Sequence, residues 1–301
     1  MTDWLDLSRR AAFESHRLIG WIFWDERAIE NYAALGVPDG VGYYVSTRAA
    51  PLAAAGNQAV VAAFYSIHPD FIGLCLDLCR QHTTFEDAVR ARDAAVVAGL
   101  REYTPEVCNG LAALAGPLWE AADALPASGR VLFAAHRDWP RPTDDGLLSA
   151  WLAVNAIREF RGDTHWAIQI AEELTGPMAG ILDNAWRSYD GDWIPRSRGA
   201  DDAMLADAYR DLEARGLAVD GAVTEAGIAY RQELETRLDR MTIPAWQALG
   251  ARRTSELIEL LEPVSDRYID RVDATAGAHW MPAGRTRLWR TDATDDQTGH
   301  P

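Results

Sequence analysis

Lysine is absent from this sequence, and cysteine is scarce. All 29 basic residues are arginines, set against 45 Asp and Glu, so the 301-residue chain has a formal net charge of -16. This balance argues against a protein that uses a broad positive surface to hold nucleic acid or an anionic membrane. The three cysteines, an odd number, are too few for a disulfide framework, which favours a reducing compartment.

Long apolar runs are missing as well. No stretch reaches the roughly 18 uninterrupted apolar residues of a membrane-spanning helix. The opening MTDWLDLSRR carries acids and arginines where a signal peptide would need a basic patch and an apolar core. We therefore expect a cytoplasmic protein with no membrane partner, long enough for two domains that each bury a core.

Residues that begin and end helices are frequent in the first half of the chain. Asp25 and Thr84 can cap helices, and Gly36 sits where a helix-ending glycine belongs. Strand signals are almost absent, so we expect an all-helical layer. The secondary structure of residues 40–52 stays open, because glycines and a proline break any long element. A linker is expected over residues 136–146, which are rich in Pro, Asp and Gly.

The second half adds a hairpin to the helices. We expect helices over residues 147–161 and 164–174, with Gly162 ending the first and Asp163 capping the second. After a loop and a helix over 201–215, Asp220-Gly221 lies between two short extended runs, which predicts a tight hairpin. The sequence predicts a mainly α fold of two helical halves, an N-terminal domain over 1–138 and a winged helix-turn-helix with a short β-hairpin wing over 139–282, followed by a disordered polar tail over 283–301.

Two resemblances support this scheme. The string DLEARGLAVDGAVTEAGIAYRQELE, residues 211–235, resembles the end of a MarR-like winged helix, with Arg-Gly-Leu before the wing and Thr-x-x-Gly after it. Across nearly the whole chain, four motifs in order resemble an actinobacterial helix-turn-helix family with no established catalytic residues: YYVSTRAAPL, VVAAFYSIHPDFI, REFRGDTH and the wing string. The chain departs from that family at Ala53, where glycine is usual, and at Phe160, where histidine is common.

The REFRGDTH cluster is the sharpest candidate site. Arg158 stands on an apolar stripe, one turn beyond Val154 and two beyond Trp151, and Arg161 is placed similarly. A cation there needs a partner, which Asp163, Glu159 or a ligand carboxylate can supply. A structural pair between Arg158 and Asp163 is the expected arrangement. His165 is a candidate proton carrier near neutral pH.

The aromatic-rich first half supplies the other candidates. Arg48, Tyr44 and Tyr65 stand among many aromatic side chains, which either line a pocket for a flat or apolar ligand or pack a core. Cys75, Cys79 and His82 share one helical face, but structural zinc normally takes four ligands from separate elements, so no metal site is predicted. No phosphate-cradling loop or nucleophile elbow is found, and no cofactor is predicted.

Charge opposes DNA binding by the predicted winged helix. Residues 141–265 carry 13 Arg against 22 Asp and Glu, and the expected recognition helix, residues 201–216, has a net charge of -3. Groove binding needs cations facing phosphates. We therefore expect a small-molecule-binding or regulatory protein on a degenerate winged-helix scaffold, with a ligand between the halves and homodimer formation left open. A MarR-like DNA-binding regulator is the alternative, and an enzyme using Arg158, Asp163 and His165 is the second alternative.

Overall fold

The computed structural model describes residues 2–288, which form sixteen α-helices and one two-stranded sheet, so the mainly helical fold predicted from the sequence is confirmed. The helices of the first half are α1 (Trp4–Gly20), α2 (Glu26–Ala33), α3 (Tyr43–Ala49), α4 (Asn57–Ala63), α5 (Pro69–His82), α6 (Phe85–Tyr103), α7 (Pro105–Ala113), α8 (Ala115–Asp123) and α9 (Val131–Asp138). Those of the second half are α10 (Gly146–Ala171), α11 (Gly176–Trp186), α12 (Trp193–Ser197), α13 (Asp202–Ala214), α14 (Glu225–Leu249), α15 (Ala251–Leu261) and α16 (Asp266–Thr275).

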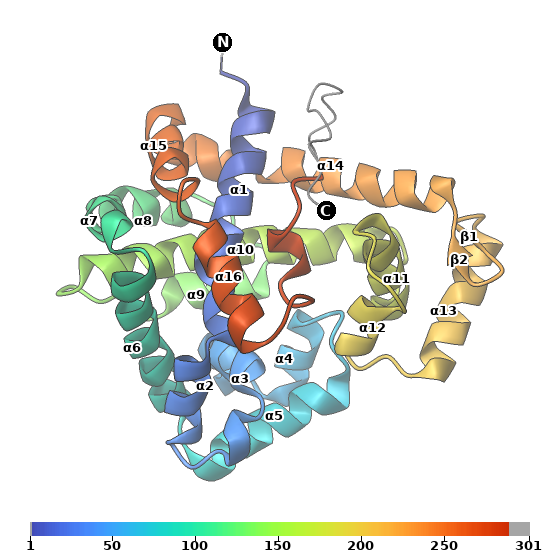
Figure 1. The fold of residues 1–301 in the computed structure, drawn as a ribbon, viewed down its shortest axis with the longest axis horizontal. Helices are drawn as coiled ribbons and strands as arrows, with labels where there is room; N and C mark the ends of the chain where they lie inside the picture. The colour runs from blue at the N-terminus through green and yellow to red at the C-terminus, as the bar shows by residue number, and fades with distance from the viewer. Residues whose placement is uncertain (1, 289–301) are drawn as a thin grey trace.

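Helix α10 runs through the middle of the molecule (Figure 1). It packs against α7, α8 and α9 from the first half and against α1 and α14 as well. Most of its residues between Leu147 and Thr164 are buried, because its sequence is apolar around most of its circumference. The indole Nε1 of Trp151 donates to the carbonyl oxygen of Leu18 at 3.0 Å, which ties α10 to α1.

The expected helix break at Gly162 is wrong. Helix α10 continues through Gly162 to Ala171 without interruption. A glycine inside a helix costs only about 1 kcal/mol relative to alanine, and packing on both sides of α10 outweighs that cost. Asp163 therefore does not cap a following helix. Its carboxylate instead accepts a hydrogen bond from Phe133 N at 2.8 Å, so it caps the separate helix α9.

The main core takes buried residues from both expected halves. One apolar cluster includes side chains from Leu7 to Met281, with α1, α6, α8, α10 and α14 all contributing. Two smaller clusters lie around α11 and α13 and beneath α3, α4 and α5. The division into residues 1–138 and 139–282 stays a prediction about folding units.

The predicted hairpin is present at one end of the molecule (Figure 1). Strands β1 (Ala218–Val219) and β2 (Ala222–Val223) are antiparallel, with Ala218 opposite Val223. Asp220 and Gly221 at the turn have φ values of 49° and 72°, which matches the tight turn expected for Asp-Gly. Thr224 then caps α14 by accepting from Gly227 N at 3.2 Å, as its position in the sequence predicted.

Three further segments can be compared with the expectations from the sequence. Residues 40–52, left open by the sequence, contain α3 and the start of a 3-10 turn, Ala50–Ala55. The loop expected over 188–199 contains the short helix α12. Of the tail expected over 283–301, residues 283–288 contact α1 and the rest lies outside the described residues. Within residues 2–288, no helix is long and apolar enough to cross a membrane.

Candidate functional site

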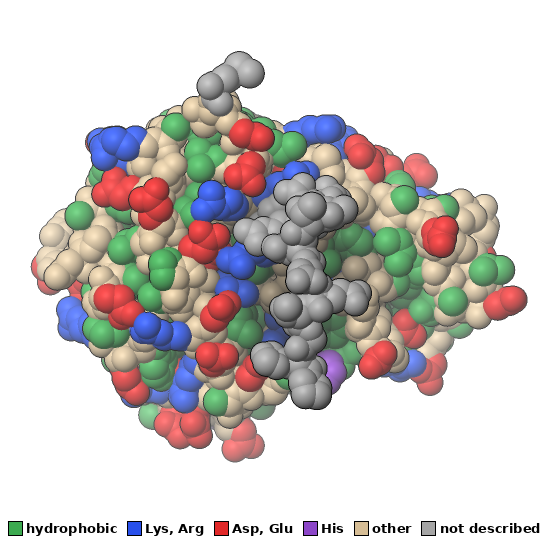
Figure 2. Space-filling model, turned by 45° about the horizontal axis from the view of Figure 1, so that its top comes forward, with side chains coloured by type: hydrophobic (Ala, Val, Ile, Leu, Met, Phe, Trp, Pro, Cys, Tyr) green, Lys and Arg blue, Asp and Glu red, His purple; other side chains and the backbone are tan. Residues whose placement is uncertain are grey.

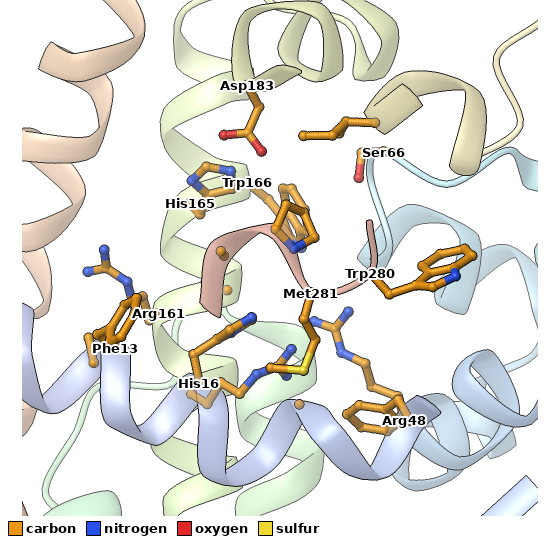
Figure 3. A pocket seen from close by; sticks show the side chains of 18 of the residues that line it. Phe13, His16, Arg48, Ser66, Arg161, His165, Trp166, Asp183, Trp280 and Met281 are labelled. Atoms are coloured by element: carbon orange, nitrogen blue, oxygen red, sulfur yellow. The ribbon is translucent and has the colours of Figure 1, made fainter. Parts of the chain in front are cut away.

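A cavity of about 530 Å³ lies where α1, α10, α11 and α14 meet the C-terminal segment, residues 277–288 (Figure 3). Side chains from α3, α5, α12 and the segment between α4 and α5 also line it. Protein cavities of a few hundred Å³ typically hold small organic molecules. The size and position of this one make it the candidate functional site.

The C-terminal segment closes one side of the cavity. Arg17 Nε donates to the carbonyl oxygen of Gly284 at 2.7 Å, and Arg187 donates to that of Pro282 at 3.2 Å. Tyr189 adds a hydrogen bond to the carbonyl oxygen of His279 at 3.1 Å. The segment therefore spans the cavity from α1 to the end of α11.

Aromatic side chains form part of the wall. Trp24 stacks on Trp280 of the C-terminal segment with ring centroids 3.9 Å apart, and it also lies parallel to Tyr44 at 6.0 Å. Trp193 meets Trp280 edge to face at 5.0 Å. Such a wall offers flat apolar surface to a ligand.

The polar part of the wall is strongly cationic, although the chain is strongly acidic. Seven arginines and only three carboxylates line the cavity within residues 2–288. The arginines are Arg9, Arg48, Arg158, Arg161, Arg187, Arg198 and Arg231, and the carboxylates are Asp183, Glu235 and Asp239. A protein with a net charge of -16 thus concentrates unbalanced positive charge around an internal space.

A buried ion pair holds one side of the cavity. Arg48 on α3 binds Glu159 on α10 in two-pronged geometry, with Nε–Oε1 at 2.8 Å and Nη2–Oε2 at 2.7 Å. Neither side chain is more than 6% exposed. Burial alone would raise the pKa of Glu159, but Arg48 and Arg158 lower it to about 2. Glu159 is therefore a carboxylate at neutral pH, shared between two guanidinium groups.

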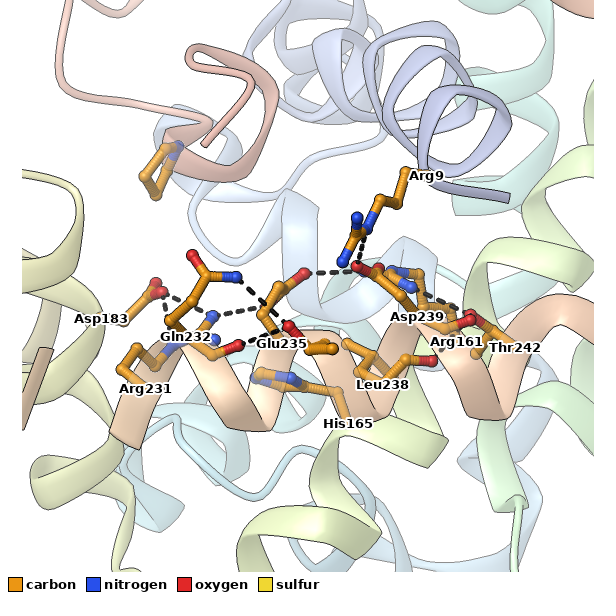
Figure 4. A network of polar contacts seen from close by, with 12 residues as sticks. Arg9, Arg161, His165, Asp183, Arg231, Gln232, Glu235, Leu238, Asp239 and Thr242 are labelled. Carbon is orange, nitrogen blue, oxygen red and sulfur yellow. Dashed lines mark hydrogen bonds and ion pairs between the residues drawn. The ribbon is translucent and has the colours of Figure 1, made fainter. Parts of the chain in front are cut away.

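A second network crosses the opposite side (Figure 4). Arg231 binds Asp183 at 2.9 Å and Glu235 at 2.8 Å. Arg161 binds Glu235 and Asp239, each at 2.7 Å, and Arg9 of α1 also reaches Asp239. These bonds join α1, α10, α11 and α14. Burial opposes ionisation of Glu235, yet the neighbouring Arg231 and Arg161 keep its pKa well below the usual range.

Arg158 and Arg198 are the least compensated of the lining cations. Arg158 has one ion pair, Nη1 to Glu159 Oε1 at 2.9 Å, and its buried Nε has no hydrogen-bond partner within the described residues. The side chain of Arg198 forms no hydrogen bond or ion pair with any described residue. Burial lowers the pKa of both guanidinium groups, and Glu159 and Asp183, respectively, only partly oppose this.

Two histidines face the same space. His16 comes from α1 and His165 from α10. Burial, together with the nearby Arg231, lowers the pKa of His165 to about 3, and burial next to Arg158 lowers the pKa of His16 well below its ordinary value. His165 also pairs with Gln169 at 2.7 Å. Both imidazoles are uncharged at neutral pH and add no positive charge.

These observations can be set beside known proteins. A family model described as a helix-turn-helix family matches residues 8–276. The chain belongs to this helix-turn-helix family. No curated protein and no solved structure shows significant similarity to it. The matched region ends one residue before the C-terminal segment that closes the cavity.

In this helix-turn-helix family member, three arginines on and beside α13, Arg196, Arg210 and Arg215, are engaged with the protein itself. Arg210 pairs with Asp207 at 2.7 Å, and Arg196 pairs with Asp202 at 2.7 Å. Arg215 donates to the carbonyl oxygens of Glu172 and Glu173. Acidic side chains predominate among the charged groups at the hairpin end of the face shown in Figure 2. No unpaired arginine is left on α13 to meet a phosphate.

Five of the eight residues singled out in the sequence line the cavity: Arg48, Tyr44, Arg158, Arg161 and His165. The other three do not. Trp151 is buried in the main core, Tyr65 donates its hydroxyl to the carbonyl oxygen of Leu174, and Asp163 caps α9. The predicted Arg158–Asp163 pair is wrong, because Arg158 binds Glu159 and the carboxylate of Asp163 accepts from the backbone of α9.

Sequence reasoning missed most of the cavity. The missed residues include His16, Arg187, Arg198, Arg231 and Trp280. Arg231 carried a usable signal, since its i+4 neighbour Glu235 and the apolar residues around it on α14 suggest a buried, paired cation. Arg198 and Trp280 lie in segments without periodicity, and only the fold brings them to the cavity.

Proposed function

We propose that this chain is a regulatory protein that binds a small anionic molecule in the cavity, on a winged helix-turn-helix scaffold of MarR-like type. The observation that carries the proposal is the excess of arginines over carboxylates around an internal cavity of drug-like size. Burying unpaired cations is costly, and a bound anion offsets that cost. The protein is therefore expected to be more stable with an anion bound in the cavity than without one.

The family supports a regulatory role, and local charge argues against direct DNA binding by the chain alone. Membership of a helix-turn-helix family points to a regulatory or DNA-binding type of protein. The order helix α13, hairpin and helix α14 fits a wing. Yet Arg196, Arg210 and Arg215, on and beside α13, are paired internally, and phosphate contacts supply most of the affinity for DNA. We therefore place the function in the cavity rather than on α13.

Native mass spectrometry of the purified protein tests the proposal. We expect a mass excess that disappears on unfolding, and the released molecule should raise the unfolding temperature of the stripped and refolded protein when it is added back. Ala245→Leu, which adds bulk at a cavity-lining position of α14, should reduce this retention. Ala229→Leu, at an exposed position of the same helix, is the matched control.

A DNA titration is the second arm. We expect no measurable binding of random duplex DNA at physiological salt by fluorescence anisotropy. A protein that carries no small molecule and binds duplex DNA with micromolar affinity and a steep salt dependence would overturn the proposal in favour of a DNA-binding regulator.

An enzyme is the second candidate function, and one observation favours it. His165 and His16 both face the cavity as neutral imidazoles beside guanidinium groups, an arrangement suited to proton transfer on a bound anion. Turnover of the retained molecule that is lost in His165→Gln but kept in His82→Gln, a substitution outside the cavity lining, would establish this reading.

A further inference from the structure

We infer that the cavity takes an aromatic carboxylate, with its carboxylate held by Arg158 and Arg198 and its ring system packed against the tryptophan wall. This rests on the proposed function and names the chemical class of the ligand. The inference starts from how charge is distributed around the cavity.

Most of the lining cations already have anionic partners. Arg48 is matched by Glu159, and Arg231 and Arg161 share Asp183, Glu235 and Asp239 with Arg9 and Arg187. Arg158 binds only one oxygen of Glu159, and both oxygens of that carboxylate also accept from Arg48. Arg198 has no partner within the described residues. Arg158 and Arg198 are therefore the two lining cations with the least anionic compensation.

Tyr44 lines the same cavity as these two arginines. Its phenol accepts a hydrogen bond from Arg48 Nη1 at 2.6 Å, which leaves the hydroxyl proton of Tyr44 free to be donated. Arg158 lies beside this pair, because it shares the carboxylate of Glu159 with Arg48. Arg198 lines the same cavity. An anion in this part of the cavity is offered donors by two guanidinium groups and one hydroxyl.

This donor set suits a carboxylate better than a phosphate. A guanidinium presents a planar fork that matches the two oxygens of a carboxylate. Phosphate sites in proteins usually add backbone N–H groups from a glycine-rich loop or a helix start, and the sequence holds no such loop. Two arginines and a tyrosine supply enough donors for the roughly four lone-pair positions of a carboxylate.

The rest of the ligand must be large, flat and apolar. Tyr44 itself stacks on Trp24, and Trp24 stacks on Trp280, so the aromatic wall begins at the anion site and extends towards the C-terminal segment. Figure 3 shows Arg48 and Trp280 on the same side of the cavity. A small anion alone would leave most of the 530 Å³ unfilled, whereas an aromatic acid places its ring against these indoles.

Paired probes test the inference. Anthracene-9-carboxylate and its neutral carboxamide have nearly the same shape, so their affinities isolate the role of the charge. Using calorimetry on ligand-stripped protein, we expect the carboxylate to bind at least about tenfold more tightly than the amide, since charge-assisted hydrogen bonds are the strong ones. Arg198→Gln and Arg158→Gln should each weaken the carboxylate about tenfold or more and leave the amide unchanged. Arg210→Gln, on exposed α13, is the matched control and should change neither affinity.

Folding of the variants is checked independently. Arg198→Gln removes an unpartnered cation, so the ligand-free variant should be at least as stable as the ligand-free wild type in urea. Equal affinities for acid and amide, or an Arg198→Gln variant that binds the acid as the wild type does, would overturn the inference. Tighter binding of 1-naphthyl phosphate than of 1-naphthoate would also overturn it.

Native mass spectrometry separates the two proposals. A retained anion that lacks an aromatic ring or a carboxylate refutes the aromatic carboxylate and leaves the anion-binding function standing. A protein that retains nothing and binds none of the probes refutes both.

Discussion

Glu159 is the residue on which the cation-rich side of the cavity depends. It is fully buried and binds Arg48 through both oxygens and Arg158 through one. Removing one partner of a buried pair strands the other charge, at a cost of about 3–5 kcal/mol. We therefore expect Glu159→Gln to lower the free energy of unfolding by that amount in urea titrations at pH 7. Glu102→Gln, in an exposed pair with Arg27, should leave the urea midpoint almost unchanged.

The same variant has a defined pH dependence. Arg48 and Arg158 outweigh burial and hold the pKa of Glu159 at about 2, below its ordinary value of 4.5. A carboxyl whose pKa is lower in the folded state stabilises the protein above its unfolded pKa and loses that effect as the pH falls through the folded value. The stability gap between wild type and Glu159→Gln should therefore shrink from about pH 4.5 towards pH 2. A gap that stays constant down to pH 2 would contradict this assignment.

Asp163 titrates in the opposite sense. Burial raises its pKa to about 7, although the hydrogen bond from Phe133 N opposes the rise. The folded state then holds a proton that the unfolded chain has lost, so the contribution of this residue to stability falls as the pH rises from about 4 to 7. We expect Asp163→Asn to gain stability relative to wild type between pH 5 and pH 8, measured by thermal unfolding. A variant that loses more at pH 8 than at pH 5 would show that the carboxylate itself is needed.

At the residue scale, the sequence predicted important side chains better than it predicted their partners. The apolar stripe of Trp151 and Val154 correctly marked Arg158 as a cation removed from water. Its partner was placed at Asp163 because Gly162 suggested a helix end. In the continuous helix, Glu159 is the carboxylate within reach, and Arg48 arrives from a segment 111 residues away. Such a long-range partner leaves no trace in a single sequence.

Among the elements, α10 gives the clearest test of local interpretation. Gly162 lies inside the helix, and an added Cβ would meet only Glu159 Oε2 at 3.4 Å and Arg48 Nη2 at 3.6 Å, which are ordinary contacts. Alanine favours a helix interior over glycine by about 1 kcal/mol. We expect Gly162→Ala to stabilise the protein by up to that amount in urea unfolding, whereas a helix-ending glycine with positive φ would make the same change destabilising.

A second glycine provides the control for this substitution. Gly227 also lies in a helix, but an added Cβ would stand 2.3 Å from the carbonyl oxygen of Leu217, the residue before β1. Gly227→Ala should therefore destabilise clearly. If Gly162→Ala and Gly227→Ala lower the stability equally, the higher helix propensity of alanine has no net effect at residue 162.

Caps and turns were the elements that the sequence predicted well. Asp25, Thr84 and Thr224 each accept from a backbone N–H at the start of the expected helix. These signals act within a few residues and need no tertiary information. The misread Asp163 uses the same chemistry on a helix that begins 32 residues earlier, at Val131. The sequence shows that a residue can cap a helix, but it does not show which helix the residue caps.

On the scale of the whole molecule, charge of opposite sign is separated between surface and interior. The chain has a net charge of -16, yet its cavity wall holds more arginines than carboxylates within the described residues. Composition alone revealed the acidic surface and its conflict with DNA binding. It could not reveal the cavity, because the seven arginines come from α1, α3, α10, α14 and the segments that follow α11 and α12.

The C-terminal segment gives the last prediction. The sequence suggested disorder from residue 283 onwards, yet Ala283, Thr286 and Leu288 line the cavity together with Trp280 and Met281. The main core depends little on these residues, because α1, α10 and α14 pack on one another directly. A chain that ends at Gly277 should therefore still unfold in one cooperative urea transition, at a lower midpoint because the contacts of Arg17 and Arg187 with the segment are lost.

Solvent access is the distinguishing measurement for this shortened chain. Trp24 loses its stacking partner Trp280, so acrylamide should quench tryptophan fluorescence more strongly than in wild type, and a retained ligand should dissociate faster. A chain that ends at Leu288 keeps every described contact and serves as the control. Unchanged quenching in the chain ending at Gly277 would show that the segment does not close the cavity. Loss of the cooperative transition would show instead that the segment belongs to the folding core.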